Sequence, residues 1–177
     1  PGLKEIAYLR RSLQVPTIFN LIAPLLNPAK HPYLLYGIYE EKSVYTMACA
    51  VQRMGIKRAL IFHGNGTDEL VPTGVIKAFE VTQQEVFQIV IEPEELGLKK
   101  CSLNDLKGGA PQENAACLRQ VFSGKTGPIA NALALNAGAA LWVYGKTASL
   151  KKGVEECLRA LQSGQVEEFY RKMVSNG

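Results

Sequence analysis

The order in which helical and strand patterns alternate constrains the fold of this chain more than any other feature. Apolar residues recur at helical spacing from Lys42 to Met54, and the short apolar strand pattern RALIFHG follows. Two further segments, GVIKAFEV and EVFQIVIEP, are separated by a polar TQQ turn and predict an antiparallel hairpin. Helical patterns dominate the rest. The sequence therefore predicts an α/β fold with a mixed sheet flanked by helices.

Capping residues and prolines mark the other expected helices. Pro16 ends an amphipathic pattern, and Ser149 is suited to cap a helix. The nearly all-apolar stretch interrupted by Asn136 is expected to be a central, buried helix. The proline-rich segment VPTIFNLIAPLLNPAKHP is expected to be a loop packed beside a site. The predicted helices span residues 1–14, 110–122, 129–144, 149–162 and 163–174.

Composition places the chain among globular proteins. Of its 177 residues, 47% are hydrophobic, far more than a disordered chain contains. One domain with a single core is expected at this length. No apolar run reaches the ~18 residues of a membrane helix, and the start PGLKEIAYLRR is not a secretory signal. Because Pro1 opens a helical pattern without a lead-in, we expect it to be a processed or cut edge.

The four cysteines and the charge balance narrow the class further. Cys49, Cys101, Cys117 and Cys157 are too far apart for a CxxC motif, so reduced, buried thiols and a cytoplasmic location are expected. The net charge of +4 is spread along the chain, so nucleic-acid binding is not expected.

The loop after the RALIF strand carries the sharpest candidate site. In α/β folds, ligands bind where strands end in such glycine-bearing loops. Asp68 and Glu69 offer oxygen ligands suited to Mg²⁺, although a solvated acidic turn is the alternative. His63 is expected to be a hydrogen-bonded strand-end residue, since no partner for a general base is visible. The pair Gly108-Gly109 either receives an anion before a helix or forms a simple turn.

Arg10 lies in the middle of the apolar stripe of the first predicted helix. An inward cation needs an anionic partner or a polar cleft, because an unpaired buried charge is expensive. The alternative is an arginine that extends from the edge of the stripe or pairs with a structural carboxylate. No covalent nucleophile is apparent, so no catalytic residue is assigned.

Six segments, in order, resemble the C-terminal part of the anthranilate phosphoribosyltransferase family over essentially all of residues 1–177. They are VPTIFNLIAPLLNPA, the helix ending at Gly55, LIFHGNGTDEL, LKGGAPQENA, LNAGAALWVYG and SLKKGVEECLRALQSGQ. The resemblance implies a mainly parallel, mixed sheet of the phosphoribosyltransferase and nucleoside phosphorylase class. It also implies transfer of phosphoribosyl from 5-phosphoribosyl-1-diphosphate to anthranilate in tryptophan biosynthesis, with Mg²⁺, in a homodimeric complete protein.

The resemblance also implies roles for individual residues. Asp68 and Glu69 match the family's acidic pair for Mg²⁺, and Arg10 matches the arginine that meets the anthranilate carboxylate. Pro1 matches a proline beside the anthranilate site. Ala23 stands where the family usually has glycine and is expected to narrow the substrate channel, and Gln14 replaces another usual glycine.

The family's helical domain and glycine-rich phosphate loop have no counterpart in these 177 residues, so this chain alone is expected to be inactive. Two alternatives stay open: a nucleic-acid-binding relative of the same fold without transferase activity, and a nucleoside phosphorylase.

Overall fold

The computed structural model describes residues 18–29 and 31–175, which fall into two units. The first unit ends at His31 and contains helix α2 (Ile18–Ile22) and the 3₁₀ helix η1 (Ala23–Leu26). The prediction of a loop here was wrong for residues 18–26. Pro24 lies in the first turn of η1, where its missing N–H costs nothing. The predicted helix at residues 1–14 lies outside the described ranges.

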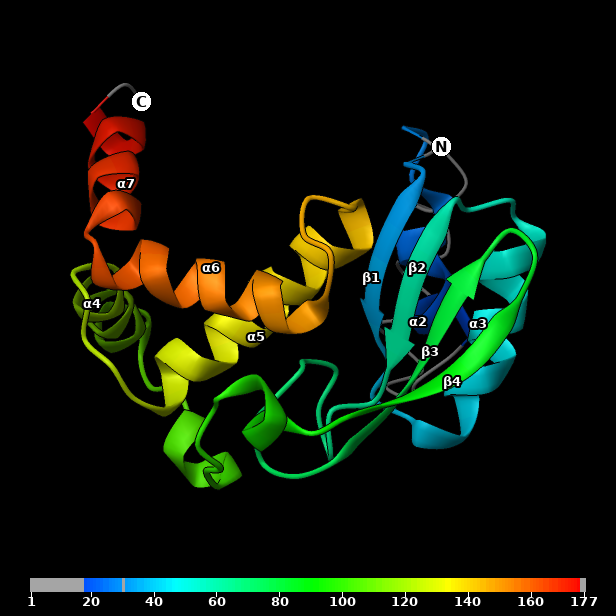
Figure 1. Ribbon diagram of the computed structural model, residues 1–177, viewed down its shortest axis with the longest axis horizontal. Helices are drawn as coiled ribbons and strands as arrows, with labels where there is room; N and C mark the ends of the chain where they lie inside the picture. The colour runs from blue at the N-terminus through cyan, green and yellow to red at the C-terminus, as the bar shows by residue number, and fades with distance from the viewer. Residues whose placement is uncertain (1–17, 30, 176–177) are drawn as a thin grey trace, which may run out of the picture. The chain divides into compact units, whose positions relative to one another are not determined.

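The second unit, residues 32–177, is built on a four-stranded sheet in the order β1-β2-β3-β4 (Figure 1). Strands β1 (Tyr33–Gly37) and β2 (Arg58–Phe62) are parallel and are joined through helix α3 (Val44–Arg53). Strands β3 (Ile76–Thr82) and β4 (Val86–Ile91) continue the sheet in antiparallel pairs. The α/β class, the mixed sheet and the hairpin are confirmed; β1 had not been predicted.

Helices cover the two faces of the sheet (Figure 1). Helix α3 packs on β2 and β3 on one face, and α5 (Pro128–Tyr144) packs on β1 and β2 on the other. Side chains alternate accordingly: Leu60 and Phe62 of β2 join the core cluster beneath α5, and Ala59 and Ile61 point to the opposite face. The predicted central helix is confirmed as α5. Among the described residues, no helix is both long and apolar enough to cross a membrane.

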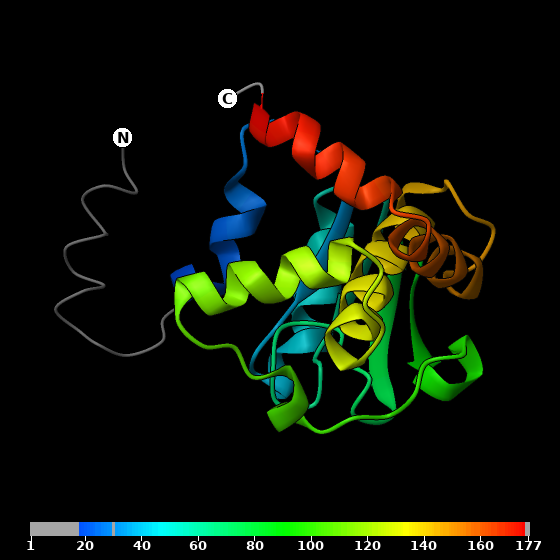
Figure 2. The same cartoon turned by 90° about the vertical axis from the view of Figure 1, so that its left-hand side faces the viewer.

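Helices α4 (Pro111–Phe122), α6 (Leu150–Gln162) and α7 (Gln165–Ser175) pack together beyond α5 (Figure 2). The Ser149 hydroxyl accepts the backbone N–H of Lys152, which confirms the predicted cap of α6. Ser163, predicted to begin the last helix, instead caps the end of α6. Gly164 then adopts a left-handed φ of 77°, and α7 starts one residue later.

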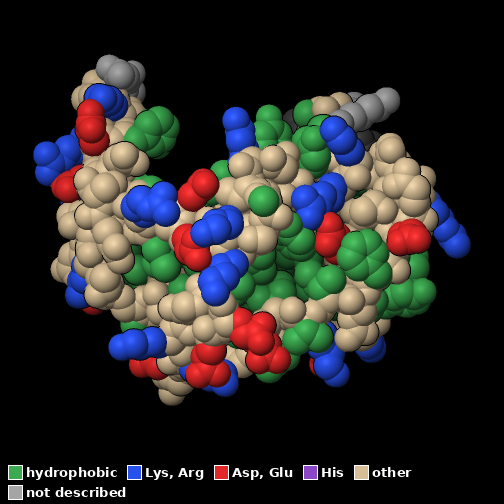
Figure 3. All heavy atoms as spheres, viewed as in Figure 1, with side chains coloured by type: hydrophobic (Ala, Val, Ile, Leu, Met, Phe, Trp, Pro, Cys, Tyr) green, Lys and Arg blue, Asp and Glu red, His purple; other side chains and the backbone are tan. Residues whose placement is uncertain are grey.

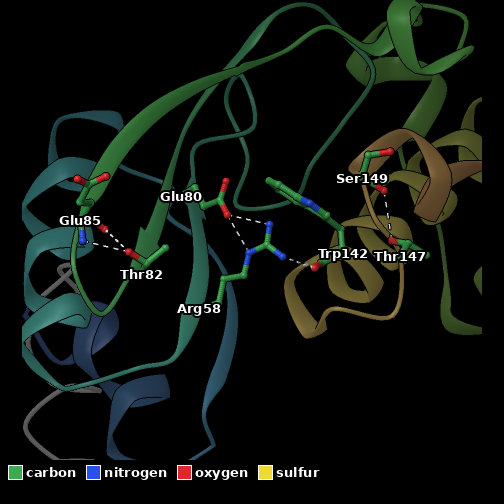
Figure 4. A network of polar contacts seen from close by, with 7 residues as sticks. All are labelled: Arg58, Glu80, Thr82, Glu85, Trp142, Thr147 and Ser149. Atoms are coloured by element: carbon green, nitrogen blue, oxygen red, sulfur yellow. Dashed lines mark hydrogen bonds and ion pairs between the residues drawn. The ribbon is translucent and has the colours of Figure 1, made fainter.

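An arginine fixes α5 to the sheet (Figure 4). Arg58 of β2 forms an ion pair of 2.8 Å with Glu80 of β3, and its Nη1 donates to the carbonyl oxygen of Trp142 at 2.8 Å. The guanidinium also lies 4.4 Å from the centroid of the Trp142 ring. One half-buried cation thus joins two strands and the last turn of α5.

Candidate functional site

The acidic loop, residues 63–70, directly follows β2 and lies at the edge where the parallel strands β1 and β2 end. This is the position at which α/β sheets bind ligands. The side chains of Asp68 and Glu69 are exposed, whereas the next residue, Leu70, is completely buried. The loop therefore presents two carboxylates to solvent from a backbone that returns to the core.

Two glycines allow the backbone of the acidic loop to pack closely against the ends of β1 and β2. A β-carbon at Gly37 would overlap the carbonyl oxygen of Asp68, and one at Gly64 would overlap the carbonyl oxygen of Glu69. Within the loop, the backbone N–H of Gly64 donates to the carbonyl of Thr67 at 2.8 Å. The carboxylate-bearing residues thus rest directly on glycine backbone.

His63 holds the start of the acidic loop, as the sequence predicted. Its Nδ1 lies 2.9 Å from the carbonyl oxygen of Ile38, and its Nε2 accepts the backbone N–H of Gly66 at 2.9 Å. Because a carbonyl can only accept, the proton is on Nδ1 and Nε2 is the acceptor. Both ring nitrogens are used in the fold, so the structure gives no support to a general-base role.

Asn136 of α5 holds the other end of the acidic loop. Its Oδ1 accepts the backbone N–H of Leu70 at 3.0 Å, and its Nδ2 donates to the carbonyl of Leu70 at 2.7 Å. The sequence showed Asn136 only as an interruption in an apolar run. A polar residue in such a run is a signal that sequence reasoning could have used.

The two adjacent carboxylates influence each other and their surroundings. Partial burial, together with the charge of Asp68, raises the pKa of Glu69. Burial, and then the charge of Asp68, raises the pKa of Tyr36 on β1. None of the ion pairs formed by the described residues involves Asp68 or Glu69. A cation placed here would relieve the repulsion between the carboxylates.

The donor set fits Mg²⁺ better than a metal that needs a closed protein site. Within residues 18–29 and 31–175, no group of three or more His, Cys, Asp or Glu side chains could hold an ion. Mg²⁺ typically takes one or two protein carboxylates and fills its other positions with water and substrate phosphates. Asp68 and Glu69 supply two such ligands.

A cavity of about 580 Å³ lies beside the pair, lined by Thr67, Glu69 and Asn136 and by apolar side chains of α4, α5 and the 3₁₀ helix η4 (Leu103–Leu106). At its rim, the backbone N–H of Gly109 donates to Asn114 Oδ1 and that of Ala110 donates to Glu113 Oε2, both at 2.8 Å. These two N–H groups are already occupied within the chain, which does not favour anion binding at this helix start.

Other predicted residues have different outcomes. Arg10 and Pro1 lie outside the described residues, and Ala23 belongs to η1 in the first unit. The four cysteines have free thiols, as predicted, but they are half-buried rather than buried.

Comparison with known proteins places this geometry in a family. The chain matches the family described as "Glycosyl transferase family, a/b domain" over residues 1–167. The anthranilate phosphoribosyltransferase of Desulfitobacterium hafniense strain Y51 is 40% identical over 174 residues, which are 98% of this chain and 52% of that protein. The chain spans about half the length of the curated relatives it matches.

Solved structures agree. The anthranilate phosphoribosyltransferase from Thermus thermophilus superposes with a TM-score of 0.89 at 40% identity, covering 99% of this chain and 52% of that one. The Saccharomyces cerevisiae enzyme, solved in complex with PRPP and Mg, gives a TM-score of 0.81 at 24% identity, covering 94% and 49%. The resemblance to anthranilate phosphoribosyltransferases is therefore confirmed, and the chain belongs to the glycosyl transferase family defined by this a/b domain.

Proposed function

We propose that the protein to which these 177 residues belong transfers phosphoribosyl from 5-phosphoribosyl-1-diphosphate to the amine of anthranilate. The observation that carries the proposal is the exposed pair Asp68 and Glu69 on a backbone fixed at the carboxyl edge of β1 and β2. The relatives that match nearly the whole chain carry the name of this activity. Residues 1–177 would be the C-terminal part of the α/β domain, with the glycine-rich phosphate loop supplied by further sequence.

The reaction breaks the bond between the ribose C1 and a diphosphate oxygen, and the diphosphate leaves with the electron pair. The amine nitrogen of anthranilate forms the new bond to C1 and loses a proton to solvent. Diphosphate is a good leaving group, so positioning and charge stabilisation supply the catalysis without a covalent nucleophile. Asp68 and Glu69 would hold Mg²⁺, which when bound neutralises charge on the diphosphate.

Arg10 would bind the carboxylate of anthranilate, since a planar guanidinium matches a planar carboxylate in two hydrogen bonds. Pro1 and Ala23 would lie beside the same substrate. The resemblance and the inward position of Arg10 on its predicted helix both support this assignment.

Steady-state kinetics of the complete protein test the proposal. Asp68→Asn with Glu69→Gln should lower activity and change its Mg²⁺ dependence, whereas an unchanged Mg²⁺ titration would remove the pair as ligands. Arg10→Ala should raise the KM for anthranilate strongly and affect phosphoribosyl-diphosphate less. Equal effects on both substrates would contradict its role.

The 177-residue chain by itself should release no diphosphate in the presence of anthranilate, and measurable release would contradict this expectation. Phosphate-dependent cleavage of a nucleoside by the complete protein would favour a phosphorylase instead. Salt-dependent DNA binding without transferase activity would favour a nucleic-acid-binding relative. On the face shown in Figure 3, basic and acidic side chains are interspersed, which does not favour DNA binding.

A further inference from the structure

We infer that Asn136 is a positioning residue that fixes the Asp68–Glu69 pair in the geometry needed to bind a divalent cation. The inference rests on the proposed function, because it takes the two carboxylates as the metal ligands. It adds a residue on α5 that no feature of the acidic loop's own sequence identifies.

Asn136 binds the acidic loop through the backbone N–H and C=O of Leu70. The carboxamide accepts from the N–H of Leu70 at 3.0 Å and donates to its C=O at 2.7 Å. The second Nδ2 hydrogen goes to the carbonyl of Ala132, one turn earlier in α5, at 2.9 Å. Both amide hydrogens are used and the oxygen accepts a bond, so the orientation of the carboxamide is determined by its partners.

The point of attachment is close to the carboxylates. Leu70 immediately follows Glu69 and is completely buried, and its hydrogen bonds to Asn136 span 66 residues of sequence. His63 holds the other end of the loop through Gly66 and Ile38. Asp68 and Glu69 therefore lie on a short span held at both ends by side chains.

Few side chains could replace Asn136. Aspartate would accept from Leu70 but could not donate to the two carbonyls when ionised. Leucine would fill a similar volume and suits the apolar helix, but it would leave the N–H and C=O of Leu70 without partners, which is costly where they are buried. A polar residue in an otherwise apolar stretch of α5 is thus explained by the loop it holds.

Mn²⁺ binding to the complete protein, followed by electron paramagnetic resonance of the free ion, tests this role. Asn136→Leu and Asn136→Ala should weaken Mn²⁺ binding about tenfold, the scale seen when residues that orient metal ligands are replaced. Asp68→Asn with Glu69→Gln should abolish it. Asn131→Ala, on the same helix beside a different cavity, should leave it unchanged. Val143→Ala, a buried truncation on α5, shows what general destabilisation alone does.

The outcomes are distinguishable. Failure of the unaltered complete protein to bind Mn²⁺ would overturn the metal assignment, and the role of Asn136 with it. Binding that depends on Asp68 and Glu69 but is unchanged in the Asn136 variants, or weakened no more than in Val143→Ala, would overturn only the positioning role. Loss of folding in both Asn136 variants, detected by circular dichroism, would also overturn it, because Asn136 would then serve the core and not the loop.

Discussion

Gly37 lies directly under the carbonyl oxygen of Asp68, and a β-carbon at that glycine would overlap the oxygen. The same β-carbon would also lie 2.9 Å from a side-chain atom of Phe62, so a side chain at residue 37 would crowd β2 as well as the loop. The last residue of β1 therefore determines how close the acidic loop comes to the sheet.

Replacing Gly37 by alanine should push the Asp68 backbone outward. We expect a loss of about 1–3 kcal/mol in unfolding free energy, typical of overpacking, and weaker Mn²⁺ binding. Urea unfolding and Mn²⁺ titration measure the two effects. Gly74→Ala is the matched control, since its nearest neighbour would be at an ordinary 3.6 Å. Unchanged Mn²⁺ affinity in Gly37→Ala would mean that this contact does not set the loop position.

Removing the guanidinium of Arg58 should destabilise the fold strongly. Arg58→Ala leaves Glu80 half-buried without its cation and the Trp142 carbonyl without its donor, so a loss of roughly 3 kcal/mol is expected in urea unfolding. Lys152→Ala, which breaks an exposed ion pair with Glu155, should cost less than about 1 kcal/mol. Similar losses of unfolding free energy in both variants would show that the Arg58 contacts stabilise the fold no more than an exposed ion pair does.

The crossing of α5 and α6 depends on two glycines. A β-carbon on Gly138 would lie 2.5 Å from the backbone nitrogen of Val154, and one on Gly153 would overlap the carbonyl of Gly138. Gly138→Ala should therefore destabilise the chain by roughly 1–3 kcal/mol, although alanine is the better helix former by about 1 kcal/mol. Ala137→Gly, at an exposed neighbouring position, should lose only the propensity difference. A higher melting temperature for Gly138→Ala would show that α5 and α6 have room for a β-carbon where they cross.

Asp105 gives a pH dependence with a definite sign. Hydrogen bonds from the backbone N–H and hydroxyl of Ser102 lower the pKa of Asp105 in the folded chain. Its stabilising contribution is complete above the ordinary aspartate pKa of 3.8 and is lost as the pH falls through the lower folded value. Asp105→Asn should melt earlier than the unaltered chain at pH 7, and the difference should shrink below about pH 4. With Ser102→Ala in place, Asp105→Asn should show less of this pH dependence.

Local patterns predicted most of the second unit. The helix ending near Gly55, the hairpin around TQQ and the Ser149 cap all follow from spacing and turn residues within a few positions. Strand β1, YLLYG, was not predicted, although its five residues are as few and as apolar as those of β2. Pairing with β2 across an intervening helix decides its structure, and no local pattern reports that.

The candidate site shows the same division between local and long-range signals. Asp68 and Glu69 could be identified from composition and from their place after a strand. The supports beneath them, Gly37 and Asn136, come from segments 31 and 68 residues away from Asp68 (68 − 37 and 136 − 68), so only the folded chain brings them together.

Helix α5 contacts the acidic loop, the sheet and helix α6. Along one rod of 17 residues, Asn136 holds the loop, Gly138 meets α6 and the Trp142 carbonyl receives Arg58. A tilt of that rod would loosen all three attachments together. On heating, the loop that carries the carboxylates and the sheet should therefore unfold together in one cooperative transition.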